Sequence, residues 1–159
     1  DALEVLRGAR PQKPFLQNGD LAWIALDATV CLGGAEERVE DSGRFFESVV
    51  EAPHRWQLRP VVVGRSRCPS HAERVLLLGA MDRLGEAERR LRRLAAAHAE
   101  EEAPPPEVSV RGSVRVVAAG PPCVSCLGVF VQFRALFAEV DLRVAFADID
   151  ALSSEAVAE

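Results

Sequence analysis

Two short segments constrain the fold of this chain more than any other feature. The first is His71-Ala72-Glu73, and the second, about fifty residues later, runs from Pro122 through Cys123 to Cys126. Imidazole and thiolate are ligands that Zn²⁺ prefers, so His71, Cys123 and Cys126 can supply three metal ligands and leave the fourth position to water. An open fourth position is typical of a catalytic rather than a structural zinc site. The fold must therefore bring two distant segments to one point.

The spacing of these residues predicts that both segments lie at helix starts. Residues three apart are neighbours on a helix, so Cys123 and Cys126 converge if a helix begins at Cys123. Two prolines stand just before that start, where proline is well tolerated. A second helix is expected to begin at Ser70 or His71, because Pro69 blocks an earlier start and Ser70 is a suitable N-cap. Both helix N-termini then point at the metal, and their partial positive charge favours thiolate and hydroxide.

The order of the two segments also predicts a reaction. H-x-E followed by P-C-x-x-C is the signature of zinc-dependent base deaminases. Zinc lowers the pKa of its bound water, and the resulting hydroxide would attack the ring carbon that carries the exocyclic amine. Glu73 is not expected to be a ligand; it would take the proton of the water, pass it to the ring nitrogen and help ammonia leave. We therefore expect an enzyme, a zinc-dependent hydrolytic deaminase that acts on a nucleobase.

Each segment taken alone has a simpler interpretation. A single C-x-x-C also occurs in redox pairs, in half of a zinc ribbon, or as two buried cysteines. A purely structural zinc site would need a fourth protein ligand, and the candidates are Cys68, Cys31, His54 and His98. Cys68, three residues before His71, is the one nearby in sequence. The two segments together favour the catalytic site.

A longer stretch around the second segment resembles a known family. It runs from Gly120 to Gly128 as Gly-Pro-Pro-Cys-Val-Ser-Cys-Leu-Gly and continues through Phe130, Gln132, Phe133 and Arg134. With the first segment it resembles the cytidine-deaminase-like superfamily, and it is most similar to the deaminase domains of bacterial polymorphic toxins. The motif order matches over about residues 59–147. The resemblance implies an α/β fold, a single three-layer domain with a mixed five-stranded sheet and helices packed on both faces.

The rest of the chain is expected to form one domain over residues 1–159, excised from a longer protein because it begins at Asp1. Apolar and β-branched runs predict strands, and Gly33-Gly34 predicts a turn, followed by an acidic stretch over 36–41. Val75, Leu78, Met81 and Leu84 recur at helical spacing and predict a long helix from His71. The expected strands are 21–26, 58–64, 108–118 (one bent strand or a hairpin around Gly112) and 142–146; short helices are expected at 2–7 and 45–50, and a helical turn at 153–159.

The segment 86–102 either extends the long helix or starts a new helix after Gly85. It contains four closely spaced arginines, Arg89, Arg90, Arg92 and Arg93. They could contact a nucleic-acid backbone. We favour the alternative, a solvated face paired with the neighbouring glutamates.

The substrate is less constrained than the metal site. Asn18, the one asparagine of the chain, Ala72 and Pro122 are candidates to line the pocket, and Arg65 and Arg67 are candidates to contact a phosphate. The toxin-like resemblance implies that the enzyme converts cytosine to uracil in a nucleic acid, DNA or RNA, and we favour this substrate; adenine is a lesser alternative. The alternatives are a free cytidine, deoxycytidine or other nucleobase deaminase of salvage metabolism, and a non-catalytic binding module.

The net charge of −5 argues against a nucleic-acid partner, because such proteins usually carry a basic footprint. We expect local segregation of positive charge, or a fused or separate targeting domain, to offset it; an immunity protein is a further expected partner. Several arginines lie close to the motifs in sequence: Arg65, Arg67, Arg74, Arg111, Arg115, Arg134 and Arg143. No apolar run approaches the length of a membrane span.

Two of the four cysteines are assigned to metal, and the other two need not form a disulfide. We therefore expect an intracellular, reducing site of action, in the cytoplasm or after delivery as a toxin.

Overall fold

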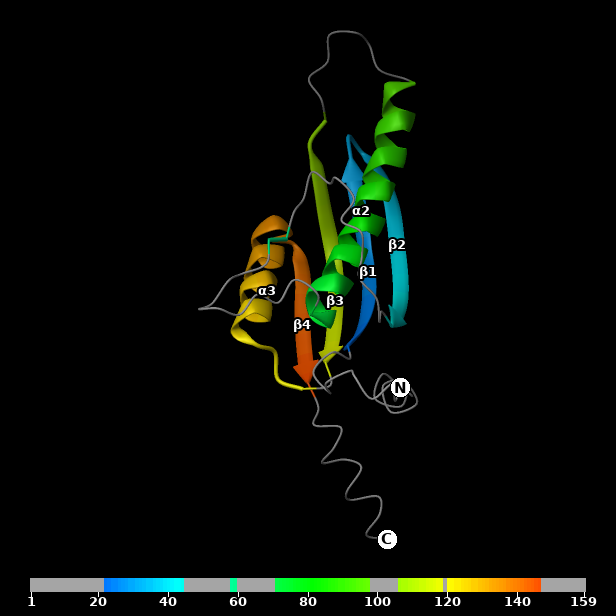
Figure 1. The fold of residues 1–159 in the computed structure, drawn as a ribbon. Helices are drawn as coiled ribbons and strands as arrows, with labels where there is room; N and C mark the ends of the chain where they lie inside the picture. Colours follow the sequence, from blue (N-terminus) through cyan, green and yellow to red (C-terminus); the bar gives the residue numbers. More distant parts are fainter. Residues whose placement is uncertain (1–21, 45–57, 60–70, 98–105, 119, 147–159) are drawn as a thin grey trace, which may run out of the picture.

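The structure, a computed structural model, describes residues 22–44, 58–59, 71–97, 106–118 and 120–146. These residues form a four-stranded sheet and two helices (Figure 1). Along the chain the elements are β1 (Ala22–Leu32), β2 (Ala35–Arg44), α2 (Ala72–Ala96), β3 (Val108–Ala118), α3 (Val124–Leu136) and β4 (Val140–Phe146). The predicted α/β class is thus confirmed for the described residues. The predicted fifth strand and the helices on a second face are not among them.

The sheet is mixed, with strand order β2-β1-β3-β4. β1 is antiparallel to both β2 and β3, whereas β4 runs parallel to β3 and is reached through α3. A parallel pair needs such a crossover, because a tight turn cannot return the chain to the same end of the sheet. Since β3 ends at Ala118 and α3 begins at Val124, the segment with the two cysteines lies at the end of the sheet where β3 terminates.

The β1–β2 hairpin turns at Gly33 and Gly34, as predicted. Their φ angles are +57° and +86°, and two successive positive φ values suit the tight turn that joins twisted antiparallel strands. The acidic stretch after the turn forms β2, which the sequence pattern did not predict as a strand. Val39 is its buried apolar residue. On the opposite face Arg38 of β2 forms a cross-strand ion pair with Asp27 of β1 at 3.0 Å.

Both helices pack on one face of the sheet. Along β1 the even-numbered side chains from Ala22 to Leu32 are all buried, which is the period of two expected of a strand covered on one side. α2 lies over β1 and β2, and α3 lies beside α2 over β4. The predicted helical stripe of α2 faces this core, with Met81 and Leu84 fully buried. The odd-numbered β1 side chains point to the other face and are half-buried or exposed.

Residues 108–118 form a single strand rather than a hairpin, and Gly112 explains how. Its φ is +140°, and a Cβ at this position would stand 2.4 Å from the carbonyl oxygen of Asp27 and 2.6 Å from the Cα of Ala28. Only glycine lets the two backbones approach this closely. β3 therefore pairs with β1 over its whole length, from Val108 to Ala118.

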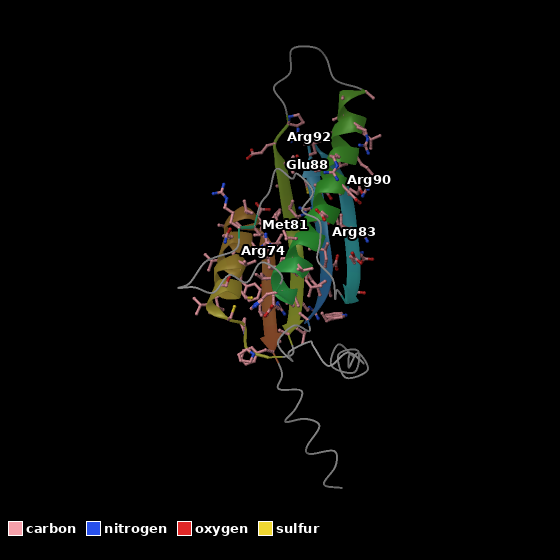
Figure 2. The ribbon with its side chains drawn as sticks, in the orientation of Figure 1. Arg74, Met81, Arg83, Glu88, Arg90 and Arg92 are labelled. Atoms are coloured by element: carbon pink, nitrogen blue, oxygen red, sulfur yellow. The ribbon has the colours of Figure 1, made fainter. Side chains whose placement is uncertain are left out.

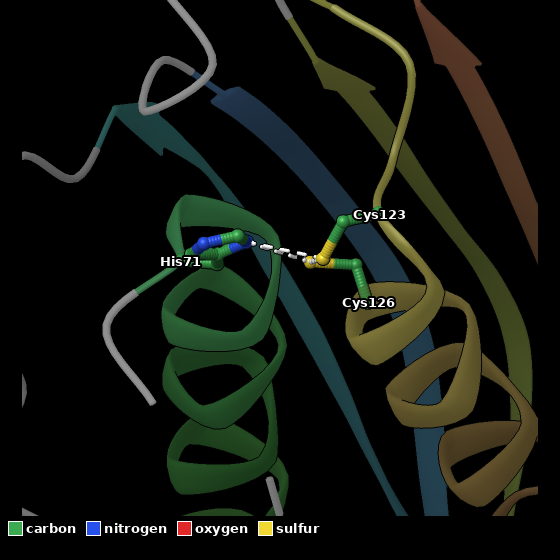
Figure 3. A group of neighbouring side chains, drawn as sticks. All are labelled: His71, Cys123 and Cys126. Atoms are coloured by element: carbon green, nitrogen blue, oxygen red, sulfur yellow. Dashed lines mark hydrogen bonds between the residues drawn. The ribbon is translucent and has the colours of Figure 1, made fainter. Parts of the chain in front are cut away.

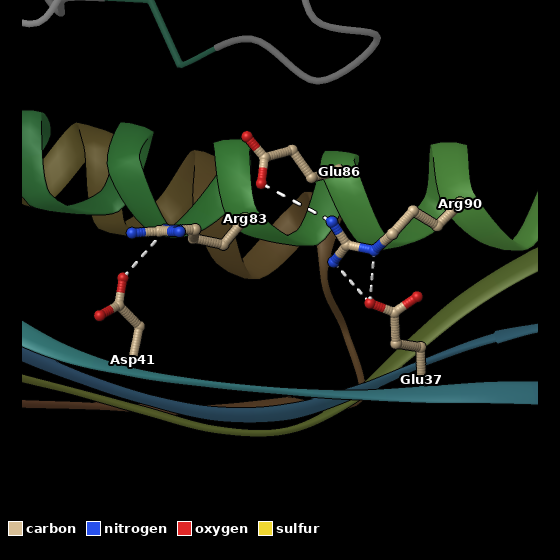
Figure 4. A network of polar contacts seen from close by, with 5 residues as sticks. All are labelled: Glu37, Asp41, Arg83, Glu86 and Arg90. Carbon is tan, nitrogen blue, oxygen red and sulfur yellow. Dashed lines mark hydrogen bonds and ion pairs between the residues drawn. The ribbon is translucent and has the colours of Figure 1, made fainter.

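α2 continues without a break through Gly85 to Ala96, so the arginine-rich segment extends the first helix. Arg90 donates to Glu37 of β2 and pairs with Glu86, and Arg83 pairs with Asp41 at 3.2 Å (Figure 4). In the same half of the helix, Arg92 donates to Glu88 at 2.8 Å (Figure 2). The pairs with Glu86 and Glu88 agree with the expectation that neighbouring glutamates neutralise this segment, and the pairs with Glu37 and Asp41 of β2 add partners that were not expected.

Several expected elements fall on residues that the structure does not describe: the helices at 2–7 and 45–50, most of the strand at 58–64, and the turn at 153–159. Of the expected strand at 58–64, the described residues Leu58 and Arg59 are not part of a strand. In the described part of the chain no helix is long and apolar enough to cross a membrane.

Candidate metal centre

The two motif segments lie at the N-termini of α2 and α3. α2 begins at Ala72 with His71 as its N-cap, and α3 begins at Val124 with Cys123 as its N-cap. Each helix thus starts one residue later than a start at the ligand itself, and Ser70, the expected cap of the first helix, is outside the described residues. Neither N-cap side chain bonds to its own helix backbone. Ser, Thr, Asp and Asn are the usual residues at this position, so both helices depart from the local rule at the same place.

Three potential ligand atoms converge between these helix ends (Figure 3). The Nδ1 atom of His71 lies 3.3 Å from the Sγ of Cys126 and 3.4 Å from the Sγ of Cys123. The two sulfur atoms are 3.6 Å apart. Among the described residues this group can hold a metal ion.

The spacing of the three atoms suits a tetrahedral zinc ion. With Zn–S of about 2.3 Å and Zn–N of about 2.0–2.1 Å, tetrahedral angles place two sulfurs about 3.8 Å apart and a sulfur and a nitrogen about 3.6 Å apart. Each distance in the structure is within about 0.3 Å of these values. One nitrogen and two sulfurs also form a donor set that favours zinc over the hard cations Mg²⁺ and Ca²⁺. The residues present therefore fit zinc in both geometry and chemistry.

Glu73 lies next to this group without belonging to it. It is the second residue of α2 and is only 3% exposed, and its Oε2 atom accepts a hydrogen bond from the Cys126 thiol at 3.5 Å. Burial raises the pKa of the Cys126 thiol, and the neighbouring Glu73 carboxylate raises it further. Deprotonation of this thiol thus needs a nearby positive charge, which a bound cation supplies. The helix N-termini add partial positive charge at the same place.

The other expected site residues divide between those near the group and those outside the described residues. Ala72 is buried as the first residue of α2, and Pro122 is half-buried directly before Cys123. Their backbones adjoin the ligands because each is a chain neighbour of one. Asn18, Arg65 and Arg67 lie outside the described part of the chain.

Cys31, one of the candidates for a fourth protein ligand, is remote from the group. It lies near the turn at the far end of β1, where its thiol contacts Glu36 at 3.7 Å. Nine strand residues, roughly 30 Å at about 3.3 Å per residue, separate it from Ala22 at the end that pairs with Ala118. The structure thus rules out Cys31 as a fourth ligand. Cys68, His54 and His98 are outside the described residues.

Three of the described arginines that lie near the motifs in sequence have partners away from the metal centre. Arg111 pairs with Glu36 at 2.7 Å and Arg143 pairs with Asp141 at 2.6 Å. Arg134 donates to the backbone oxygen of Val140 at 3.1 Å, beyond the C-terminal end of α3. Each of these arginines therefore binds a carboxylate or a backbone oxygen close to its own position in the fold.

Two polar side chains on the helices of the centre have partners that the sequence did not predict. Arg74, expected to add positive charge near the site, is 5% exposed and donates to the backbone oxygen of Leu58. Gln132 of α3 pairs with the backbone of Arg59. No local pattern marks either residue, because both bind a segment that is distant in sequence.

Comparisons with known proteins identified no relative of this chain. No protein-family model matches the chain, no curated protein matches it, and no solved structure matches it.

Proposed function

We propose that this chain is a zinc-dependent hydrolytic deaminase that converts cytosine to uracil. The observation that carries the proposal is the convergence of His71, Cys123 and Cys126 within 3.3–3.6 Å of one another at two helix starts, with the buried carboxylate of Glu73 beside them. Three protein ligands leave a zinc ion with one position for water or substrate. The separate carboxylate meets the need of such a reaction for a proton carrier.

The arrangement of the described elements supports the resemblance from which the proposal began. A mixed sheet, with one ligand segment before a helix over β1 and the other at the start of the β3–β4 crossover, suits a deaminase-like domain. We extend the proposal to the fold: a fifth strand and helices on the second face of the sheet would complete a three-layer domain of the cytidine-deaminase-like kind.

Each residue of the centre has a distinct role in the proposed reaction. The Nδ1 atom of His71 and the two thiolates would hold the zinc ion. When bound, zinc supplies Lewis acidity, which makes water a nucleophile near neutral pH. Glu73 would accept one proton of the attacking water at its carboxylate and donate it to the ring nitrogen of cytosine. It would then carry the second proton of the water, from the hydroxyl now on the ring carbon, to the amine, which leaves as ammonia. Burial of Glu73 keeps bulk water from competing for this proton.

The burial of Glu73 favours an enzyme over a non-catalytic binding module. Burying a carboxylate costs free energy, and its cost grows when thiolates lie nearby. A domain that only holds metal or binds a protein has no use for a carboxylate that is 3% exposed and is not a ligand. A group that must exchange protons beside the metal explains this placement.

For the substrate we propose a cytosine within DNA or RNA, because a small deaminase can accept an unstacked or flipped base into a tight pocket. A second candidate, a free nucleoside or base, is favoured by specific observations. The net charge is −5, and Arg111 and Arg143 are held in ion pairs on the sheet. Polyanion binding depends on basic groups that can neutralise phosphates.

A deamination assay tests the proposal. Zinc-loaded protein is incubated with cytidine, deoxycytidine, single- and double-stranded DNA, and RNA, and uracil formation is measured. The matched control is Glu73→Gln, which keeps the side-chain size but cannot accept a proton. We expect the control to bind zinc normally and to lose about 10²–10⁴-fold in rate.

The outcomes separate the candidates. Uracil in a polynucleotide but not in nucleosides supports the proposed substrate. Turnover of nucleosides alone replaces it with the salvage reaction. Activity retained by Glu73→Gln contradicts the role of Glu73, and no product on any cytosine substrate contradicts the proposed function as a whole.

A further inference from the structure

One dipeptide, Leu58-Arg59, links the two helices that carry the metal centre. On the side of α2, the Nε and Nη2 atoms of Arg74 donate to the backbone oxygen of Leu58 at 3.2 and 3.0 Å. Leu58 is 2% exposed and joins the hydrophobic core. Because the guanidinium is planar and charged, two donations to one oxygen hold this carbonyl strongly against α2.

On the side of α3, Gln132 binds the next residue of the dipeptide in both directions. The backbone N–H of Arg59 donates to Oε1 of Gln132 at 2.9 Å, and Nε2 of Gln132 donates to the backbone oxygen of Arg59 at 2.9 Å. The same Nε2 donates to the backbone oxygen of Gly128 at 3.3 Å, which holds the amide to its own helix. Only an amide side chain offers an acceptor and two donors in one plane for this set of bonds.

These contacts lie close along each helix to the proposed metal ligands. Arg74 is three residues after His71, less than one turn along α2. Gln132 is six residues after Cys126, about 9 Å along α3. The distance from the His71 ring to the two sulfurs depends on how the two helices are spaced, and the dipeptide bridges them near that point.

We propose that Gln132 and Arg74 are positioning residues for the metal centre, acting through Leu58-Arg59. They hold α2 and α3 at the separation that keeps the Nδ1 atom of His71 within 3.3–3.4 Å of both sulfurs. This inference rests on the proposed metal centre but not on the proposed reaction. Since bond lengths to zinc tolerate deviations of only about 0.2 Å, a small change in helix spacing lowers the affinity for zinc.

The position of Gln132 allows this role to be separated from general stability. Its bonds with Arg59 lie at the exposed edge of the structure, whereas the core side of α3 is filled by Val129 and Phe133. Replacing Gln132 leaves that packing intact. Arg74 is buried, so its loss would disturb folding as well, and the test is therefore built on Gln132.

The experiment compares zinc binding by the full chain and three variants. Gln132→Glu keeps the side-chain length but cannot donate to the Arg59 oxygen, and Gln132→Ala removes the whole link. Val131→Ala is the matched control, since Val131 is the preceding residue of α3 and is 69% exposed. The zinc dissociation constant is measured by competition with a chromophoric chelator. The visible spectrum of the Co²⁺-loaded protein reports the ligand geometry, and the melting temperature of the metal-free protein reports stability.

We expect both Gln132 variants to alter the Co²⁺ spectrum and to bind zinc about 10-fold more weakly, which is the lower end of the losses caused by removing outer-shell partners, since Gln132 acts through the helix spacing. The Val131→Ala control should match the unaltered chain. A lowered melting temperature with unchanged zinc affinity and spectrum would mean that Gln132 has only a structural role, and this would overturn the inference. Unchanged values in all three measurements would overturn it as well.

Failure of this inference can be told apart from failure of the proposed function. If the unaltered chain binds zinc but deaminates none of the substrates, the reaction is wrong and the positioning role still stands on the zinc measurements. If the chain deaminates cytosine and the Gln132 variants bind zinc normally, only the inference fails. If the unaltered chain binds no zinc, both fail.

Discussion

Replacing Cys126 with alanine should abolish most of the stabilisation that zinc gives to this protein, whereas replacing Cys31 should not. Cys126 is 1% exposed, and its sulfur lies 3.3 Å from the His71 ring nitrogen and 3.6 Å from the Cys123 sulfur. Cys31 lies near the β1–β2 turn, remote from the metal centre, and contacts Glu36. Each substitution removes one thiol group, so the difference between the two zinc effects reports the contribution of the metal centre.

The size of the effect follows from linkage between binding and folding. Zinc at 100 times its dissociation constant stabilises the folded state by about 2.7 kcal/mol. For a chain of 159 residues, about 1 kcal/mol shifts the melting temperature by about 2–4 °C, so zinc should raise it by about 5–11 °C. Loss of a direct ligand should weaken binding by at least about 100-fold, the upper range for outer-shell partners. At the same zinc concentration the stabilisation then falls to about 0.4 kcal/mol, or about 1–2 °C.

The assay is calorimetric melting of the unaltered chain, Cys126→Ala and Cys31→Ala, each with and without zinc. The shift caused by zinc is compared within each protein, so any change in the stability of the metal-free variant cancels. We expect a full shift for Cys31→Ala and a nearly absent one for Cys126→Ala. Equal shifts in the two variants would refute the assignment of Cys126 as a ligand and with it the three-atom centre.

Three further perturbations test the fold and the site. Gly112→Ala should lower the free energy of unfolding by about 2–6 kcal/mol in urea denaturation, from backbone strain and a clash with the Asp27 oxygen at 2.4 Å. Gly34→Ala, with open space around it, should cost about 1–2 kcal/mol; equal losses would contradict the close approach of β1 and β3. Phe133→Ala should cost about 3–5 kcal/mol, because the ring is fully buried; a loss below about 1 kcal/mol would contradict its core position. Zinc affinity should weaken as pH is lowered, because protons compete for the imidazole and thiol ligands. A pH-independent dissociation constant in chelator competition would argue against thiolate ligation.

Predictions from local patterns agree with the structure where a local rule governs the outcome. The apolar residues of α2 recur at helical spacing, so they lie on one face of the helix and are buried together. The prolines before Cys123 lie outside α3 because proline is excluded from helix interiors. β2 escaped prediction for the opposite reason. Its stretch over 36–41 is mostly charged, and it becomes a strand because β1 supplies backbone partners along its length and Arg38 pairs with Asp27 across the strands.

The candidate site divides in the same way. Residue type and spacing alone identified His71, Cys123 and Cys126, since ligand chemistry is a property of the side chains and a spacing of three is a property of the helix. Whether Cys31 could join them depended on the pairing of β1 with β3. Where Arg83 and Arg90 find their partners depended on the packing of α2 against β2. The pattern of the chain does not encode such distances.

The sequence by itself thus predicted three candidate metal ligands, a glutamate beside the first of them, helices that begin next to the ligands and the α/β class, because residue type and local spacing carry this information. Only the tertiary structure decided that the two segments meet within 3.3–3.4 Å, that Glu73 is buried against Cys126, and that Gln132 and Arg74 bind one dipeptide between the helices. Most of these contacts join residues more than fifty positions apart, and the remaining pair, Arg74 and Leu58, is buried. Such contacts form only when the sheet brings α2 and α3 side by side.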